Sequence, residues 1–425
     1  MNEVKIEKFN IDGSGHVRLD GRDFHIWNAL PEEVVAIEIT AKKKGKREAK
    51  VTNHLSASPL RIAPLEDHFT SCSPWQILSL QDEQKFKKEI ALRVFKDLPE
   101  VSSLLASNDP FTNSVRQNYR HKMEYHVYTD DENNFHLGFF GRTEKKKIPC
   151  GECALATKAL NDLATKIISW LDQVKFPRPL LKTIIVRSNT KGEAIAALFA
   201  KTKEIDPLLN SPFPNLTIYY SNPKSPASVA DETLVEAKQN TLKETLCGIE
   251  FTYGIMSFFQ INPQVFEEAL RDISEFIEEG SSVVDFYSGV GTIGLSLKGK
   301  VRDLVLVEEN KDAVAFAKQN ILENNIKNAE AYLGQAHDLR EYISRDKILI
   351  IDPPRGGLHP KVIKKILSEK PPRIIYLSCN IESQARDLKE LEEGYDPIFA
   401  RLYNFFPMTP HVESLVILDR RTDIL

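Results

Sequence analysis

The stretch VVDFYSGVGTIGLSL, residues 283–297, decides the fold of the C-terminal half of this chain. An apolar run leads into Asp285, a turn at Gly289 and Gly291 follows, and the next residues have the apolar spacing of a helix. The glycines let the backbone approach a ligand closely. No Gly-Lys-Ser/Thr follows, so this is not a phosphate-binding P-loop, although such a turn would also suit NAD.

Outward from this stretch, apolar strands alternate with helices. Continuous apolar strands separated by helices are typical of a parallel, doubly wound sheet in an α/β domain. Ligands bind at the carboxyl ends of the strands in such sheets. The predicted strands within residues 241–425 are SSVVDFYS, DLVLVEEN, AEAYLG, KILIIDPP, RIIYLSC, IFARLYNFF and SLVILDR.

Two acidic residues follow strands at the predicted ligand edge. Glu308 lies about 20 residues beyond the glycine turn, where an acidic residue suits a ribose with free hydroxyls. The turn and Glu308 together indicate an adenosine ligand, with a surface carboxylate as the alternative. Asp352 ends another strand, and the two prolines after it would stiffen a loop that positions a substrate. An ordinary proline turn is the alternative there.

Cys379 and Glu413 lie at the ends of later strands. A cysteine in a strand is often part of the core, but a thiol beside a cofactor could be a nucleophile if a partner or a lowered pKa makes it a thiolate. A carboxylate near a bound ligand could act as a base. Taken alone, Glu413 would be read as a surface residue.

The N-terminal half is organised differently. Residues 1 to about 60 contain several short strands with Asp-Gly and Gly-Ser-Gly turns, which favours a small β-barrel. Residues 61 to about 240 mix helices and strands. Two basic runs, AKKKGKREAK at 41–50 and GRTEKKK at 141–147, could contact RNA or could be solvated faces.

Composition limits the class of protein. A net charge of −4 argues against a protein that coats nucleic acid by bulk charge. No apolar run approaches ~20 residues, so we expect no membrane span. The charged start MNEVKIEKFN lacks a signal core, and the five cysteines are scattered. We therefore expect a reducing, cytoplasmic setting.

These clusters, in this order, resemble the RNA uracil-5-methyltransferase family, which makes 5-methyluridine in transfer and ribosomal RNA. The matching segments are SFFQINPQV (257–265), DFYSGVGTIGLSL (285–297), VEEN (307–310), DPPRGGL (352–358), SCN (378–380), HVE (411–413) and, in the central region, YRHKMEY (119–125). The resemblance implies a Rossmann-like class I methyltransferase domain, a mixed α+β central domain and an N-terminal OB-like barrel of the TRAM type. The implied domains are 1–60 (TRAM-like), 61–240 (RNA-binding) and 241–425 (methyltransferase).

The resemblance also implies a reaction and its residues. Cys379 would add to carbon 6 of a uracil that has left its stack, and Glu413 would remove the carbon 5 proton after methylation by S-adenosylmethionine. Phe405 and Phe406 could hold the base or could be core. The residues implied to line the S-adenosylmethionine site are Gln260, Tyr287, Thr292, Glu308, Gln335 and Asp352.

The chain departs from the family at several positions. Many members hold a 4Fe-4S cluster on three clustered cysteines and one distant cysteine. Here Cys72 stands alone where three are expected, and Cys150 and Cys153 lie near the place of the fourth. A complete cluster is therefore not expected, and the reaction requires no metal. A three-cysteine site or a transient disulfide stays open.

Three further departures leave the nucleophile and the base intact. They are Ser288 in place of a cysteine, Ile381 in place of a proline and Asn404 in place of an aspartate. They bear on loop stiffness and on the choice of substrate.

Other functions are weighed against this one. A methyltransferase for exocyclic amino groups would carry an aromatic residue after the two prolines, where this chain has Arg355. A cytosine-5 methyltransferase would pair its cysteine with a different loop. A non-catalytic RNA-binding relative would not need both Cys379 and Glu413, and a small-molecule enzyme would not need the extra domains. The target RNA stays open, and we expect a monomer whose RNA affinity depends on salt.

Overall fold

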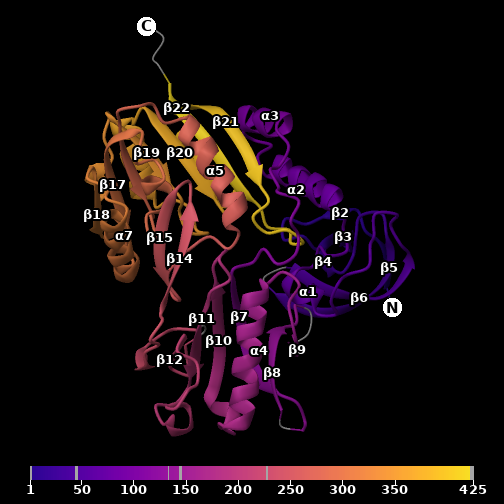
Figure 1. The fold of residues 1–425 in the computed structure, drawn as a ribbon. Coiled ribbons are helices and arrows are strands. Elements are labelled where there is room, and N and C mark those ends of the chain that lie inside the picture. The colour runs from indigo at the N-terminus through magenta and orange to yellow at the C-terminus, as the bar shows by residue number, and fades with distance from the viewer. Residues whose placement is uncertain (1, 44–45, 133, 143–145, 226–227, 422–425) are drawn as a thin grey trace. The chain divides into compact units, whose positions relative to one another are not determined.

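The computed structural model describes residues 2–421 except 44–45, 133, 143–145 and 226–227. The chain packs as two compact units. The first comprises residues 1–86, 114–242 and 407–410, and the second comprises residues 87–113, 243–406 and 411–425. Each unit therefore borrows short segments from the other half of the chain (Figure 1). The division into three domains at residues 60 and 240 stays a prediction.

The first unit begins with a six-stranded sheet in the order β1-β5-β6-β4-β3-β2. Its strands are β1 (Asn2–Lys5), β2 (Lys8–Phe9), β3 (Gly15–Leu19), β4 (Arg22–Trp27), β5 (Val34–Lys43) and β6 (Lys46–Ser56). One apolar core fills it, made of Val4, Ile6, Val17, Phe24, Ile26, Ala29, Val35, Ile37 and Ala49. The β-rich start is confirmed, whereas the OB-like form stays a prediction.

A second sheet of this unit has the order β13-β12-β11-β10-β7-β8-β9. Its strands are β7 (Lys122–Thr129), β8 (Phe135–Phe140), β9 (Lys147–Pro149), β10 (Leu181–Ser188), β11 (Ala194–Ala200), β12 (Leu216–Tyr220) and β13 (Glu232–Val235). Helix α4 (Lys158–Gln173) packs on β8, β10 and β11 through an apolar face. The Thr157 hydroxyl caps this helix by accepting a hydrogen bond from the N–H of Leu160.

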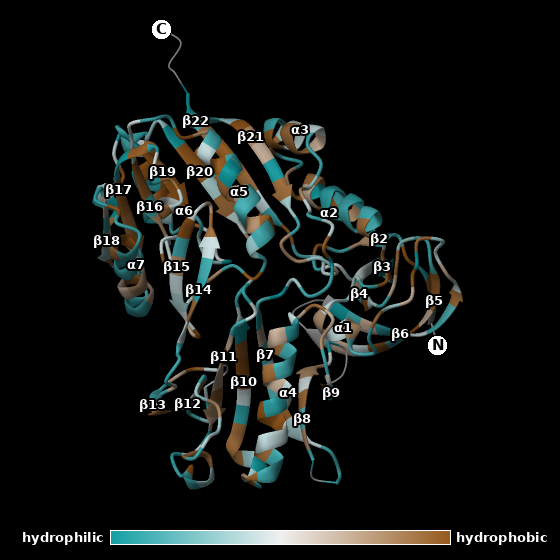
Figure 2. Cartoon of the chain, viewed as in Figure 1, coloured by the Kyte–Doolittle hydropathy of each residue, from teal (hydrophilic) through white to brown (hydrophobic). Residues whose placement is uncertain are grey.

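The second unit is built on a seven-stranded sheet in the order β18-β17-β16-β19-β20-β22-β21. The strands are β16 (Ser281–Phe286), β17 (Val301–Glu308), β18 (Ala329–Leu333), β19 (Lys347–Ile351), β20 (Arg373–Ser378), β21 (Tyr395–Tyr403) and β22 (Glu413–Arg420). The helices between them are α6 (Thr292–Leu295), α7 (Lys311–Glu323), α8 (Pro360–Glu369) and α9 (Ile381–Leu391). Brown hydrophobic residues dominate these strands, whereas teal residues are frequent on the helices (Figure 2).

The prediction of an all-parallel sheet is wrong at one edge. β16 to β20 pair in parallel, but β22 runs antiparallel to both β20 and β21. The connection from β21 to β22 is residues 404–412 and contains no helix. A parallel crossover needs about a dozen residues and usually a helix, so this short link dictates an antiparallel pair.

The remaining elements lie outside these three sheets. A hairpin of β14 (Thr241–Leu246) and β15 (Ile249–Gly254) precedes α5 (Pro263–Glu275). The other helices are α1 (Phe69–Cys72), α2 (Leu80–Val94), α3 (Pro99–Ser107), η1 (Arg178–Leu180), η2 (Asp206–Leu208) and η3 (Arg340–Tyr342). None of the helices that the structure describes has the length and apolar character needed to cross a bilayer.

Candidate active site

The strand register of the second unit brings the predicted site residues to one edge of the sheet. Phe286 pairs with both Val307 and Ile351 in parallel register. The next residue of each strand is Tyr287, Glu308 or Asp352, so these three residues lie side by side. The parallel strands thus deliver three predicted cofactor residues to neighbouring positions.

The glycine turn after β16 has a backbone that few residues tolerate. Gly289 and Gly291 have φ angles of 57° and 92°, and Tyr287 has a φ of 63°. A Cβ atom built on Gly291 would lie 2.7 Å from the Leu295 side chain, whereas one on Gly289 would meet nothing within 4 Å. Gly291 is therefore needed for packing, and the backbone at Gly289 borders open space where a ligand can approach. A left-handed tyrosine is a strained conformation of the kind found at functional sites.

Two carboxylates flank this turn. Glu308 accepts hydrogen bonds from the N–H groups of Gly289 at 2.9 Å and Asn310 at 2.8 Å, one on each oxygen. Each carboxylate oxygen keeps a lone pair that could accept from a ribose hydroxyl. Asp285 accepts from the N–H of Gly294 with Oδ2 at 2.9 Å, while its buried Oδ1 has no hydrogen-bond partner. A buried oxygen without a partner is what an absent polar ligand would leave behind.

Cys379 and Glu413 are neighbours across two antiparallel strands. Ser378 pairs with Ser414 in antiparallel strands, so Cys379, which follows Ser378, lies opposite Glu413, which precedes Ser414. Opposed residues of such a pair have Cα atoms roughly 5 Å apart. Glu413 is 3% exposed, and its Oε2 is buried without a hydrogen-bond partner. The Cys379 thiol and the unsatisfied carboxylate oxygen of Glu413 therefore lie at the same edge of the sheet, which we call the rim.

The electrostatics of this rim are dominated by burial and negative charge. Burial first, then the charges of Glu413 and Asp352, raise the pKa of the Cys379 thiol to about 11, while the charge and a hydrogen bond of Arg355 lower it. The pKa of Glu413 is raised well above its usual value by burial and then by Asp352, again opposed by Arg355. Burial raises the pKa of Asp352 to about 7. In Asp285, burial is the main cause of a pKa of about 8.

The other predicted cofactor residues lie in three different settings. Thr292 begins α6 directly after the glycine turn. Gln335 is exposed and lies two residues beyond β18, next to Gly334, whose N–H donates to the carbonyl of Glu308. Gln260 is buried in the segment between β15 and α5, which the register of the sheet does not place at the rim. The sheet topology thus brings the strand-end residues together, whereas the position of Gln260 depends on the conformation of the segment between β15 and α5.

Two of the positions that depart from the family, and one aromatic residue beside them, have defined local settings. Ile381 is the first residue of α9 after the N-cap Asn380, a position that suits a proline but does not require one. Asn404 is buried and accepts a hydrogen bond from Lys87 Nζ at 2.6 Å. Phe405 is fully buried and packs edge-on against Phe266, so it belongs to the core.

Sequence reasoning missed some residues that the structure adds. Arg355 was noted only as the residue after the prolines, yet it is the cation that acts on both Cys379 and Glu413. Asp285 was noted as a strand end but not as a buried carboxylate whose Oδ1 has no hydrogen-bond partner. Both lie inside the segments that carry the resemblance, so their position in those segments was the available signal.

The remaining cysteines of interest lie in the first unit. Cys150 and Cys153 are buried, Cys72 is half-buried, and His68 stands between the thiols of Cys72 and Cys150. The sequence indicated the three cysteines but not the histidine.

Comparisons with known proteins support a single family. A sequence model of the tRNA (uracil-5-)-methyltransferase family matches residues 100–421. An RNA methyltransferase of Caldanaerobacter subterraneus subsp. tengcongensis is 28% identical over 446 residues, covering 98% of each chain. Another, of Bacteroides thetaiotaomicron, is 28% identical and covers 92% of this chain and 95% of its own.

A solved structure has a similar fold. The crystal structure of Pyrococcus abyssi tRNA (uracil-54, C5)-methyltransferase in complex with S-adenosyl-L-homocysteine matches with a TM-score of 0.79 and 24% identity. The match covers 98% of this chain and all of that one. Since the family model spans most of the sequence and the relatives align end to end, this chain is an RNA methyltransferase that belongs to the tRNA (uracil-5-)-methyltransferase family.

Proposed function

We propose that this enzyme transfers the methyl group of S-adenosylmethionine to carbon 5 of a uridine in transfer RNA, through a covalent bond between Cys379 and carbon 6. The observation that carries the proposal is the pair formed by Cys379 and Glu413 across β20 and β22, at the same sheet edge as the glycine turn. Family membership supports uracil and transfer RNA as the substrate class.

The charge of the rim supports this cofactor. Asp285, Asp352 and Glu413 all have raised pKa values, with burial as the main cause. A site with several desolvated carboxylates favours a cationic ligand, because the cation stabilises their charged forms. When bound, S-adenosylmethionine supplies an electrophilic methyl group on a sulfonium cation. The P. abyssi protein holds S-adenosyl-L-homocysteine, which is what that cofactor becomes after losing the methyl group.

Particular residues would hold the cofactor. The backbone at Gly289 borders open space, and Glu308 offers acceptor lone pairs for the ribose hydroxyls. The unpartnered Oδ1 of Asp285 would accept from a donor of the ligand. The further members of the proposed site are Gln260, Tyr287, Thr292, Gln335 and Asp352.

The thiol solves a problem of reactivity. Carbon 5 of uracil is a poor nucleophile, but the ring is an α,β-unsaturated carbonyl that a thiolate can attack at carbon 6. Formation of the S–C6 bond moves an electron pair toward carbon 5, which then forms its bond to the methyl carbon as the sulfonium–methyl bond breaks. Arg355 assists because its charge and hydrogen bond favour the thiolate of Cys379.

The carboxylate completes the reaction. The buried Oε2 of Glu413 takes the proton from carbon 5, and the electron pair of that C–H bond re-forms the double bond. The S–C6 bond breaks at the same time and returns the thiolate. This role requires Glu413 to be ionised, which its raised pKa opposes and which Arg355 and a cationic cofactor favour.

The six-stranded sheet of residues 2–56 would contact the RNA as a TRAM-like module. Lysines and arginines of the predicted basic runs would supply part of the contact with phosphates. The centres of both runs, residues 44–45 and 143–145, lie outside the described residues. The strands β5 and β6 contain the two ends of the first run and are part of the described sheet.

The test is a methylation assay with a trap for the covalent intermediate. Purified protein would be incubated with radiolabelled S-adenosylmethionine and transfer RNA from cells that lack the gene, and the RNA digested to nucleosides. We expect labelled 5-methyluridine with the wild type and none with Cys379→Ala. Label in ribosomal RNA alone would replace transfer RNA as the substrate, and label on another nucleoside would overturn the proposed chemistry.

A substrate containing 5-fluorouridine sharpens this assay. Fluorine at carbon 5 cannot leave as a proton, so the adduct with Cys379 should persist through denaturing electrophoresis. Methylation without any trapped adduct would refute the covalent route while leaving the uridine assignment standing.

A further inference from the structure

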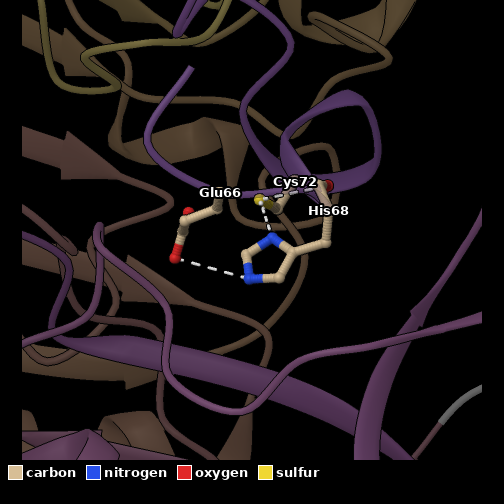
Figure 3. Close-up of side chains that lie close together, drawn as sticks. All are labelled: Glu66, His68 and Cys72. Atoms are coloured by element: carbon tan, nitrogen blue, oxygen red, sulfur yellow. Dashed lines mark hydrogen bonds and ion pairs between the residues drawn. The ribbon is translucent and has the colours of Figure 1, made fainter. Parts of the chain in front are cut away.

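The first unit contains a compact cluster of metal-ligating side chains that the proposed methylation does not use. Glu66, His68 and Cys72 each offer one ligand atom, and these atoms lie within 4.8 Å of one another (Figure 3). His68 and Cys72 are four residues apart, and Cys72 is the last residue of the short helix α1. Two more thiols reach the same place from the loop before α4, those of Cys150 and Cys153.

The distances within this cluster suit a single ion. Nδ1 of His68 lies 3.3 Å from Sγ of Cys72, and Nε2 lies 3.3 Å from Sγ of Cys150. The neighbouring thiol of Cys153, together with burial, raises the pKa of the Cys72 thiol. A sulfur and a nitrogen bound to one tetrahedral Zn²⁺ are about 3.5 Å apart, from Zn–S and Zn–N bonds of about 2.3 and 2.0 Å. His68 and Cys72 are therefore already close to the spacing that one ion requires, whereas Cys150 faces the opposite nitrogen of the ring.

The surroundings hold the cluster in place. Asn161 in α4 accepts from the N–H of Cys153 at 3.2 Å and donates to its carbonyl at 3.1 Å. Glu66 accepts from the N–H of Ala154 and lies 3.4 Å from Nε2 of His68. A carboxylate on the far nitrogen of a histidine is the usual way to orient a metal-binding imidazole.

The four-cysteine cluster found in many relatives does not fit here. The chain has five cysteines, and Cys247 and Cys379 belong to the other unit. Three thiols remain in the first unit. A cube of four irons is usually held by four thiolates, whereas this cluster offers three thiols and one imidazole. The donor set, three thiols and one imidazole, is instead one of the common structural zinc sets.

We propose that the first unit binds one Zn²⁺ through the thiolates of Cys72 and Cys153 and Nδ1 of His68, with Cys150 as the fourth ligand. Cys150 faces the other ring nitrogen, so its side chain must rotate to reach the ion. Binding releases the three thiol protons to solvent and leaves no redox change. The ion would join the segment of residues 66–72 to the loop that leads into α4. Its role is structural, and it takes no part in methylation.

Metal analysis of the full-length protein tests the proposal. Protein purified from cells grown with zinc and iron should contain about one zinc per chain by mass spectrometry of the elements. Cys72→Ser and Cys153→Ser should reduce zinc to near zero, and Cys150→Ser should weaken retention less. Cys247→Ser is the matched control, because this cysteine lies in a hairpin turn of the other unit, and it should keep the full zinc content.

Two measurements on the wild type keep the proposal testable if a variant fails to fold. Replacement of zinc by Co²⁺ should produce a thiolate-to-cobalt charge-transfer band in the near ultraviolet. Zinc should also protect three cysteines from iodoacetamide, and a strong chelator should remove that protection. Iron with acid-labile sulfide, a Cys72–Cys153 disulfide without metal, or zinc that survives in the Cys72→Ser/Cys153→Ser double variant would each overturn the proposal.

Discussion

The rim that holds Cys379 and the cluster around His68 differ in the groups that surround their thiols. At the rim of the second unit, one thiol lies among carboxylates with Arg355 as a nearby cation. In the first unit, the thiols of Cys72 and Cys150 contact opposite nitrogens of the His68 ring, and the Glu66 carboxylate lies 3.4 Å from Nε2. In our proposals, the rim favours a cationic cofactor and its thiol forms a bond to carbon, whereas the other cluster favours a soft metal ion. The same residue type thus serves two chemistries, because neighbouring charge decides what a thiol can do.

The clusters also differ in how the fold assembles them. The rim arises from strand ends that the order of a doubly wound sheet brings to one edge. The other cluster joins Cys150 to His68 across 82 residues of sequence, by the packing of a loop on a short helix. The first arrangement follows from topology, while the second depends on tertiary packing.

The largest effect should come from removing the catalytic thiol. We expect Cys379→Ala to lower methylation by about 10³-fold or more, because no other group can form the bond to carbon 6. Single-turnover methylation of transfer RNA would measure the loss. Zinc content should stay unchanged, which separates the two clusters. An activity within tenfold of wild type would remove Cys379 from the mechanism.

The base should give a different signature from the nucleophile. Glu413→Gln should reduce turnover by roughly 10²- to 10⁴-fold, since proton abstraction is lost but addition and methyl transfer are not. A covalent protein–RNA complex should therefore accumulate, visible as a shifted band in denaturing electrophoresis. Slow turnover without that complex would assign Glu413 to an earlier step.

Cofactor affinity should depend on the carboxylate after β17. Glu308→Ala leaves the N–H groups of Gly289 and Asn310 without their acceptor and removes the proposed ribose contact. We expect the Kd for S-adenosylhomocysteine to rise roughly 10- to 100-fold, as measured by calorimetry. Glu309→Ala, at the exposed neighbouring position, is the control and should bind normally. Equal losses in both variants would argue against a specific role for Glu308.

Replacing Arg355 should change the pH dependence of Cys379 reactivity. Its charge lowers the pKa of Cys379, so Arg355→Gln should raise that pKa further and reduce the thiolate fraction at neutral pH. We expect alkylation of Cys379 at pH 7 to slow by about three- to tenfold, a modest change because Arg355 is exposed. The loss should shrink as pH rises toward the pKa of the thiol. Arg355→Lys keeps the charge and should recover part of the rate.

The last prediction compares two forms of the cofactor. S-adenosylmethionine carries a sulfonium charge that S-adenosylhomocysteine lacks, while their shapes are nearly alike. The charged form should lower the pKa of Cys379 from about 11 by about one unit more than the neutral form. The pH dependence of alkylation, followed by mass spectrometry of the peptide, gives both values. Equal pKa values with the two cofactor forms would show that the sulfonium charge does not affect the Cys379 thiol.

Much of the fold could be predicted from local patterns. Apolar runs identified the strands β16 to β22, and the turn-rich start predicted short strands that the structure places in the sheet of residues 2–56. The antiparallel edge was missed because strand direction depends on whether a helix fits in the connection, here residues 404–412. The interleaving of the two units was not predicted, since no local pattern reports which half a short segment packs against.

Residue types and their order in the chain were sufficient to identify the family and to propose the nucleophile, the base and the cofactor residues, because strand ends in a doubly wound sheet share one edge. The tertiary structure alone decided the pairing of Cys379 with Glu413 and the unsatisfied oxygen of Asp285. It also decided the contacts of His68 with the thiols of Cys72 and Cys150. These features depend on distances between segments far apart in sequence and on the removal of water from charged groups, and both arise only when the chain packs.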